Sequence, residues 1–258
     1  MGSHRGADLL DPRLADHTHV VRTPQFLSQT DIETVHAVAA AHIAGRTPGD
    51  FVDTPGKWYL QDGGVPSALR PIISRIAALA TRVDADNWGI LDDEKHDGDG
   101  PLLARCVEYH QYHDGGRRIC GVHCDAGSVF TADLMLSHTT EFEGGALLTH
   151  TSDGDGRITA THRNTFERGD CVIFISHKKH SVEAVRSGQR DVLVVELWQE
   201  CECAANHRCM GAPPCMPVEA ASDVDEPGAP GRVQPHGRES GLGHARCETS
   251  QRTGRENL

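Results

Sequence analysis

Two stretches in the first ninety residues carry apolar side chains at the spacing of an α-helix. The first starts at a Thr-x-x-Glu capping box, Thr30 to Glu33, and ends at Gly45. The second follows the Gly-Gly-Val-Pro turn at 63–66 and ends over 84–88. Their apolar positions are Ile32, Val35, Val38, Ala39 and Ile43, then Leu69, Ile72, Ile73, Ile76, Leu79, Ala80 and Val83. Both stretches are predicted to be amphipathic packing helices.

From Leu102 onward the pattern changes to short apolar or alternating runs separated by turns. The runs are LLARCVEYHQY (102–112), SVFTADLMLS (128–137), GALLTHT (145–151), RITATH (157–162), CVIFIS (171–176) and DVLVVELW (191–198). No helical period lies between them, and strands spaced in this way are typical of a β-sandwich or barrel. The sequence therefore predicts a mainly β (α+β) fold with two helices in front of it.

Polar and irregular segments flank this region. Residues 1–24 are expected to be a flexible N-terminal segment, and 25–200 the folded domain, with its β core at about 102–200. Residues 201–216 form a Cys-rich end of the domain. Residues 217–258 lack aromatic side chains and are rich in Gly and Pro, so they are predicted to be a disordered tail. The acidic stretch 91–100 lacks EF-hand spacing and is read as a solvated loop.

Composition excludes several classes of function. The formal net charge of −12, with no Lys/Arg stripe, disfavours general nucleic-acid binding. No apolar run is long enough for a transmembrane helix, and the first residues lack the apolar core of a signal peptide. The nine cysteines fit no simple disulfide framework. We therefore expect a cytoplasmic or other reducing intracellular location.

The richest chemical signal lies among the 17 histidines. Only His123 has an acidic residue two positions later, Asp125, and side chains at this spacing share one face of an extended segment. Further on come EFEGGAL (141–147), Gly-Asp before the run CVIFIS, and a segment from His180 that reaches Arg190. His-x-Asp alone is a weak motif in so His-rich a chain, but the order of all four is specific.

This order resembles the prolyl-4-hydroxylase-like branch of the Fe(II)/2-oxoglutarate oxygenases. The resemblance covers roughly residues 25–200 and implies a double-stranded β-helix (jelly-roll) with N-terminal flanking helices. It implies that His123, Asp125 and His180 hold Fe(II) and that Arg190 binds the distal carboxylate of 2-oxoglutarate. In the family the distal His precedes this basic residue by ten positions, a spacing that fits His180 and not His177.

The resemblance also implies an aromatic cosubstrate-binding residue on the strand before the metal-binding segment. Tyr109 is the candidate, although a tyrosine that only packs its ring is an equally good reading. Where many prolyl hydroxylases have Thr, two residues after the Gly-Gly pair, this chain has Leu147. The sequence therefore does not identify peptidyl proline as the substrate.

The activity implied is that of a 2-oxoglutarate-dependent dioxygenase, an oxidoreductase that hydroxylates a C–H bond and releases succinate and CO2. Its cofactors would be Fe(II), 2-oxoglutarate and O2, with ascorbate as an optional addition. The substrate would be a small molecule or a peptide. The sequence identifies neither the substrate nor the oligomeric state. The alternatives are a cupin-like metal-binding jelly-roll without 2-oxoglutarate chemistry and a catalytically inactive interaction module.

Two local alternatives stay open. Arg190 could be a structural cation paired with Glu183 or Asp191 at a strand edge. The cluster Cys201, Cys203, Cys209 and Cys215 could hold free thiols, a structural zinc or disulfides, since its spacing fits no common zinc-finger template.

Overall fold

The computed structural model describes residues 18–45, 56–91, 101–113, 121–153, 155–199 and 202–204. All of them belong to one compact unit, Met1–Pro217. Nearly all of the predicted acidic loop, most of the Cys-rich end and the whole predicted disordered tail lie outside the described residues.

The first helix, α2 (Gln29–Ala44), begins two residues earlier than predicted. Its N-cap is Ser28, whose hydroxyl accepts a hydrogen bond from the Asp31 backbone N–H, while the Asp31 carboxylate accepts one from the Ser28 backbone N–H. The capping box is therefore Ser28 to Asp31, and the prediction of Thr30 as the cap was wrong. The end at Gly45 is confirmed.

The second helix, α3 (Arg70–Asn87), has Leu69 as its N-cap and a proline in its first turn, where the missing N–H costs no intrahelical bond. It ends at Trp88, as the sequence predicts. All seven apolar positions predicted for this stretch are buried. The helical period therefore located this element and its buried face correctly.

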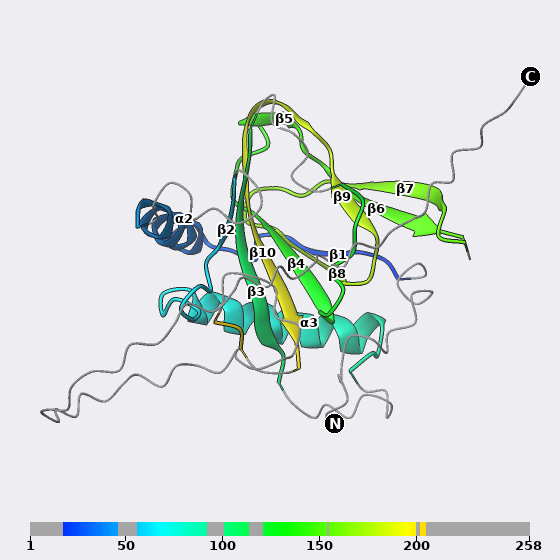
Figure 1. The fold of residues 1–258 in the computed structure, drawn as a ribbon, viewed down its shortest axis with the longest axis horizontal. Helices are drawn as coiled ribbons and strands as arrows, with labels where there is room; N and C mark the ends of the chain where they lie inside the picture. The colour runs from blue at the N-terminus through cyan, green and yellow to red at the C-terminus, as the bar shows by residue number, and fades with distance from the viewer. Residues whose placement is uncertain are drawn as a thin grey trace, which may run out of the picture. The chain divides into compact units, whose positions relative to one another are not determined.

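The strands are β1 (Val21–Thr23), β2 (Lys57–Tyr59), β3 (Leu103–His113), β4 (Phe130–Met135), β5 (Phe142–Gly144), β6 (Leu147–Ser152), β7 (Ile158–Asn164), β8 (Cys171–Ile175), β9 (His180–Val182) and β10 (Val185–Trp198). The large sheet has the order β1-β8-β4-β10-β3-β2, with β5 paired to β10, and the small sheet has the order β7-β6-β9. Every pairing is antiparallel. Figure 1 shows α2 and α3 beside the large sheet and the β6–β7 ribbon extending on the other side. The predicted jelly-roll with flanking helices is confirmed.

The large sheet is buried on both faces. One face packs against the helices, where Phe130 and Leu193 of the sheet share a cluster with Ile76 of α3. The other face packs toward the small sheet through side chains such as Phe174 and Val192. A strand covered on both sides has no need of polar residues at alternate positions, which explains the continuous apolar run of β8.

The N-terminal segment contains a strand that the sequence did not reveal. Within the segment expected to be flexible, residues 21–23 form β1, which pairs with β8. Asp170 fixes this segment, because its carboxylate accepts hydrogen bonds from the Arg22 side chain at 2.6 Å and from the Gln25 backbone N–H at 2.9 Å. For the described part of that segment, the expectation of flexibility was wrong.

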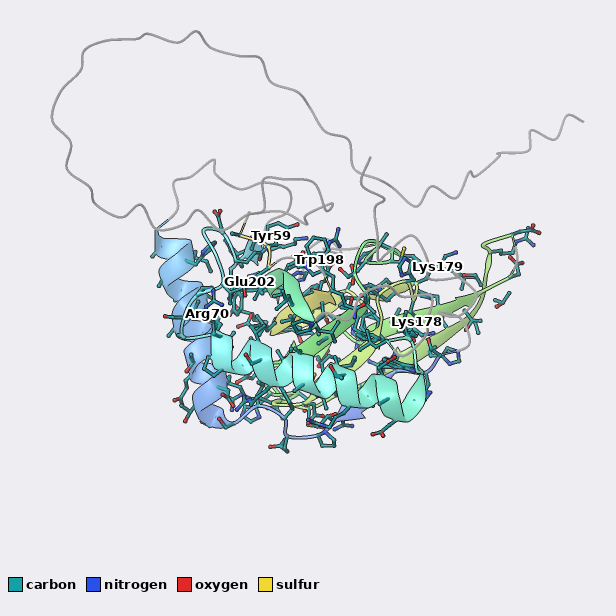
Figure 2. All side chains as sticks on the ribbon, turned by 90° about the horizontal axis from the view of Figure 1, so that it is seen from below. Tyr59, Arg70, Lys178, Lys179, Trp198 and Glu202 are labelled. Atoms are coloured by element: carbon teal, nitrogen blue, oxygen red, sulfur yellow. The ribbon has the colours of Figure 1, made fainter. Side chains whose placement is uncertain are left out.

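The last described residues, 202–204, return to the start of β3. The Cys203 N–H donates to the Ala104 carbonyl at 3.0 Å, and Glu202 forms an ion pair with Arg70 at 2.8 Å, where the two side chains lie together in Figure 2. Cys203 is fully buried and disulfide-bonded. Among the three alternatives, the disulfide therefore applies to Cys203.

That disulfide is more typical of an oxidising environment, so the reducing compartment stays a prediction. Neither α2 nor α3 has the length and apolar composition that a membrane-spanning helix requires.

Candidate metal centre and ligand site

Three side chains meet between the two sheets: His123, Asp125 and His180. One ligand atom from each lies within 4.8 Å of the others. The Asp125 carboxylate oxygens are 3.6 Å from His123 Nε2 and 3.5 Å from His180 Nε2. Asp125 and His180 are buried, whereas the His123 side chain is 27% exposed, so the group is open on the His123 side. The structure thus brings together all three ligands expected from the sequence.

The backbone fixes this meeting point. His123 and His180 exchange two backbone hydrogen bonds, of 3.0 and 2.8 Å, although they are 57 residues apart. The Asp125 N–H donates to the Ser176 carbonyl at 2.8 Å. The His-x-Asp segment is therefore held along β9 and the turn before it, which places His180 opposite His123 and leaves His177 outside the group.

Both imidazoles present the nitrogen that a metal requires. His123 Nδ1 lies 2.8 Å from the Gly121 carbonyl, and His180 Nδ1 lies 2.9 Å from the Lys178 carbonyl. A carbonyl can only accept, so Nδ1 of each ring carries the hydrogen and Nε2 carries the lone pair. Both Nε2 atoms face Asp125. Two neutral imidazoles and one carboxylate suit Fe(II) with open coordination positions, whereas a structural zinc site would have a fourth protein ligand.

Asp125 is oriented by the inner face of β4. The Thr131 hydroxyl donates to Asp125 Oδ2 at 2.8 Å and lies 2.9 Å from Ser176 Oγ. Removing a group that orients a metal ligand typically weakens metal binding by about 10- to 100-fold. Thr131→Val should therefore weaken Fe(II) binding by about that factor, measured by anaerobic competition with a chelating dye. The control Thr81→Val removes an exposed helical hydroxyl and should leave the affinity unchanged; equal affinities in both variants would contradict this role.

A buried ion pair supports the turn that follows Asp125. Arg105 Nη1 donates to the Ala126 carbonyl at 3.1 Å, to Ser128 Oγ at 2.9 Å and to Glu196 Oε2 at 3.0 Å. Gly127 has a φ of +98°, and a Cβ there would lie 2.6 Å from Nη2 of Arg105. The guanidinium therefore packs directly under the turn, where only glycine leaves it enough room.

Arg105→Met is expected to lower the free energy of unfolding by about 3–5 kcal/mol, because it leaves the Glu196 carboxylate in the interior without its guanidinium counter-charge. Arg163→Met is the matched control. It breaks an exposed pair with Glu183 and should cost less than about 1 kcal/mol. Urea unfolding of the ligand-free proteins measures the free energy of unfolding of both variants. Equal decreases would show that the buried pair stabilises the fold no more than the exposed pair.

Arg190 lies on β10, fully buried, in register with Tyr112 of β3. None of its three side-chain nitrogens has a hydrogen-bond partner among the described residues. Its guanidinium carbon lies 5.0 Å from the centre of the Tyr112 ring and 5.7 Å from that of Phe166. Gly145 leaves room for it, since a Cβ there would come within 2.8 Å of Arg190 Cδ. The Gly-Gly motif thus serves the placement of this arginine.

The alternative partners for Arg190 are engaged elsewhere. Glu183 pairs with Arg163 at the surface. Asp191 accepts from the Tyr109 hydroxyl at 3.0 Å and from the Gln189 side chain at 2.8 Å. Burial lowers the pKa of Arg190, and Tyr112 and nearby carboxyl groups act in the opposite direction. Burying a cation without hydrogen bonds costs free energy, and the N–H groups of the Arg190 guanidinium are arranged to bind a planar anionic ligand.

The structure does not bring Tyr109 to Arg190. The Tyr109 side chain belongs to the cluster on the helix side of the sheet, where its hydroxyl also lies 3.0 Å from His36 Nδ1. Tyr112 belongs to the cluster between the sheets and lies against Arg190. Residues three apart on a strand point to opposite faces, so the expected role of Tyr109 fails for a geometric reason. That parity could have identified Tyr112, because Arg190 and Tyr112 are paired in register.

The inner face of β3 carries a polar line that the sequence did not predict. Glu108 accepts from Lys57 Nζ at 3.0 Å and lies 2.6 Å from His110 Nε2. His110 Nδ1 in turn lies 2.9 Å from the Tyr112 hydroxyl. Cys106, Glu108 and Glu196 also lie close enough to hold a metal ion, but Lys57 and Arg105 already neutralise the two carboxylates. We assign this group a structural charge-pairing role.

Sequence comparison identifies no relative. No protein-family profile matches the chain, and no curated protein matches it.

Comparison of structures does find similar folds. A prolyl-4-hydroxylase from Pseudomonas putida aligns with a TM-score of 0.50 at 17% identity, over 73% of this chain and 98% of that one. The alpha ketoglutarate dependent carbocyclase SnoK from nogalamycin biosynthesis aligns with a TM-score of 0.54 at 16% identity, over 77% and 87%. The epimerase SnoN of the same biosynthesis aligns with a TM-score of 0.54 at 18% identity, over 83% and 92%. The chain therefore has the jelly-roll fold of the non-heme Fe(II)/2-oxoglutarate oxygenases.

Proposed function

We propose that this protein is an Fe(II)- and 2-oxoglutarate-dependent dioxygenase that hydroxylates a C–H bond of its substrate and releases succinate and CO2. The observation that carries the proposal is the pairing of an open His-Asp-His group with a buried Arg190 that has no hydrogen-bond partner among the described residues. A cupin-like metal protein would not need a buried guanidinium without hydrogen bonds on the inner face that also carries its metal ligands. The arginine therefore favours the oxygenase over that alternative.

Each residue then has a defined task. His123, Asp125 and His180 would hold Fe(II) through Nε2, one carboxylate oxygen and Nε2, leaving positions open for 2-oxoglutarate and O2. Bound together, these supply the oxidising chemistry, which the protein itself lacks. Arg190 would bind the distal carboxylate of 2-oxoglutarate through two parallel hydrogen bonds. Tyr112, and not Tyr109, is the aromatic residue beside that carboxylate.

The protein also controls water and geometry. The Phe174 ring lies edge-on to His180 with centroids 4.9 Å apart, and Phe174 is fully buried. Val192 and Val194 line the same inner face of β10. An apolar lining of this kind excludes water from one side of the metal group, which strengthens the charge interactions inside it. The exposed side at His123 is the direction from which we expect the substrate to enter.

The type of reaction and the substrate are the finer parts of the proposal. The structural relatives include a prolyl hydroxylase, a carbocyclase and an epimerase, so this fold supports outcomes other than hydroxylation. A small molecule and a peptide are both compatible with the site. Ascorbate would act only as an added reductant.

Turnover tests the proposal. Protein loaded anaerobically with Fe(II) and then given 2-oxoglutarate and O2 should form succinate and CO2, slowly if no substrate is present to couple the reaction. His123→Ala should form none under the same conditions. If the wild type binds Fe(II) and forms no more succinate than His123→Ala over a broad panel of small molecules and peptides, the proposal is wrong and the inactive interaction module is favoured.

A further inference from the structure

One buried carboxyl group inside the jelly-roll has no hydrogen-bond or ion-pair partner among the described residues. Asp133 lies on β4, in register with Val194 of β10 and with Val172 of β8. Both valines belong to the cluster between the two sheets, so Asp133 faces the same interior as Arg190. The residue is 6% exposed, and within the described part of the chain its carboxyl group forms no hydrogen bond or ion pair.

A second carboxyl group in the same row provides the contrast. Glu108 is in register with Val194 from the other side, so Glu108 and Asp133 flank one valine of β10. Unlike Asp133, Glu108 has close partners, with Lys57 at one carboxylate oxygen and His110 at the other. Buried polar groups normally find a partner, because leaving one unsatisfied costs about 1–3 kcal/mol. Within the described residues Asp133 departs from this rule, so its carboxyl group is available to a ligand that enters the space between the sheets.

The charges around Asp133 indicate what kind of partner it is. Arg190 faces it from β10 and Glu108 from β3, and Asp125 of the metal group is also close enough to influence its charge. The neighbouring Cys171 thiol of β8 belongs to the cluster on the helix side of the sheet. Burial raises the pKa of Asp133 to about 7; Arg190 acts against this shift, and the Asp125 and Glu108 carboxylates add to it. Near neutral pH the group can therefore carry a proton and donate a hydrogen bond, as some buried carboxylic acids do in enzymes.

The position of Asp133 lies between the two ends of the candidate ligand site. Thr131, two residues earlier on the same face of β4, holds the metal ligand Asp125. Arg190 lies toward the other end of that inner face, because Val192 pairs with Met135 and Arg190 precedes Val192 by two residues. A dicarboxylate that extends from Arg190 to the metal group would therefore pass Asp133.

We propose that Asp133 is a ligand-binding residue of this site, and that its protonated carboxyl group donates a hydrogen bond to the dicarboxylate held by Arg190. This inference rests on the proposed function, since it takes 2-oxoglutarate as that dicarboxylate. An ionised Asp133 would repel the dianion and compensate the charge of Arg190. The protonated group instead adds a donor and leaves the guanidinium free for the ligand.

The test is the pH dependence of 2-oxoglutarate binding to the Fe(II)-loaded protein, measured anaerobically by calorimetry from about pH 6 to about pH 8.5. The Kd of the wild type should rise by up to about tenfold per pH unit above about pH 7, because binding requires one proton on Asp133. Asp133→Asn keeps a donor of similar shape at every pH, so its Kd should stay flat. The iron ligands are the same in both proteins, and their titration therefore cancels in the comparison.

Two further variants complete the test. Asp133→Leu removes the donor and the charge, and should bind with a flat profile but about five- to tenfold more weakly than Asp133→Asn. Glu143→Gln removes an exposed carboxylate of β5 and should retain the wild-type profile. A wild-type Kd independent of pH, or the same slope in wild type and Asp133→Asn, would overturn the inference. Absence of 2-oxoglutarate binding at every pH would instead overturn the proposed function.

Discussion

Arg190→Met is expected to abolish measurable 2-oxoglutarate binding while leaving the ligand-free protein at least as stable as the wild type. The arginine is fully buried, and its nitrogens have no hydrogen-bond partner within the described residues. Removing one side of a buried charge pair typically costs about 2–5 kcal/mol of binding. Replacing a buried charge that lacks hydrogen bonds by an apolar side chain removes its desolvation cost, so the ligand-free protein should not lose stability. Calorimetry with Fe(II)-loaded protein and urea unfolding of the ligand-free protein measure the two effects.

The opposite directions of these effects make the prediction specific. Truncation of a structural arginine would destabilise the protein, as expected for Arg105, whose guanidinium donates to Ala126, Ser128 and Glu196. A large loss of stability in Arg190→Met together with unchanged 2-oxoglutarate binding would therefore show that Arg190 serves the fold and not a ligand.

His180→Ala is expected to remove Fe(II) binding, whereas His177→Ala should retain it. His180 Nε2 faces Asp125 at 3.5 Å, and His177 is not part of the metal group. The loss in His180→Ala should exceed the roughly 10- to 100-fold typical of removing a group that only supports a ligand. Anaerobic titration with Fe(II), followed by competition with a chelator, gives both affinities.

The two histidines stand three residues apart on the same segment, so they are matched in local sequence. If His177→Ala lost the metal and His180→Ala kept it, the ligand set proposed above would be wrong. Retention of full affinity in both variants would place the metal elsewhere in the chain.

The sequence was most informative where a period or a motif is local. The stripe from Leu69 to Val83 identified α3 and its buried face, because one face of a helix must be apolar to pack. His-x-Asp is such a motif, and the resemblance to the prolyl-4-hydroxylase-like oxygenases, with its ten-residue spacing, implied His180 and Arg190. The structure places all four side chains between the two sheets. These features depend on neighbours in the sequence, which a single chain displays directly.

Features that depend on pairing between distant strands were missed. β1 is three residues long and owes its existence to β8 and Asp170, about 150 residues away. The choice between Tyr109 and Tyr112 required the register of β3 against β10, because that register decides which face each tyrosine occupies. Asp133 was not singled out from the sequence, because it is one of several polar residues in the run 128–137. Only its burial between two sheets, without a partner in the described chain, makes it notable.

The most direct test of the central claim is an anaerobic equilibrium titration of the wild-type protein with 2-oxoglutarate, with and without Fe(II). We predict one 2-oxoglutarate bound per chain in the presence of Fe(II), and much weaker binding without metal, because the metal group and Arg190 hold opposite ends of the same molecule. Tight Fe(II) binding with no 2-oxoglutarate binding, or 2-oxoglutarate binding of equal affinity with and without Fe(II), would contradict this account.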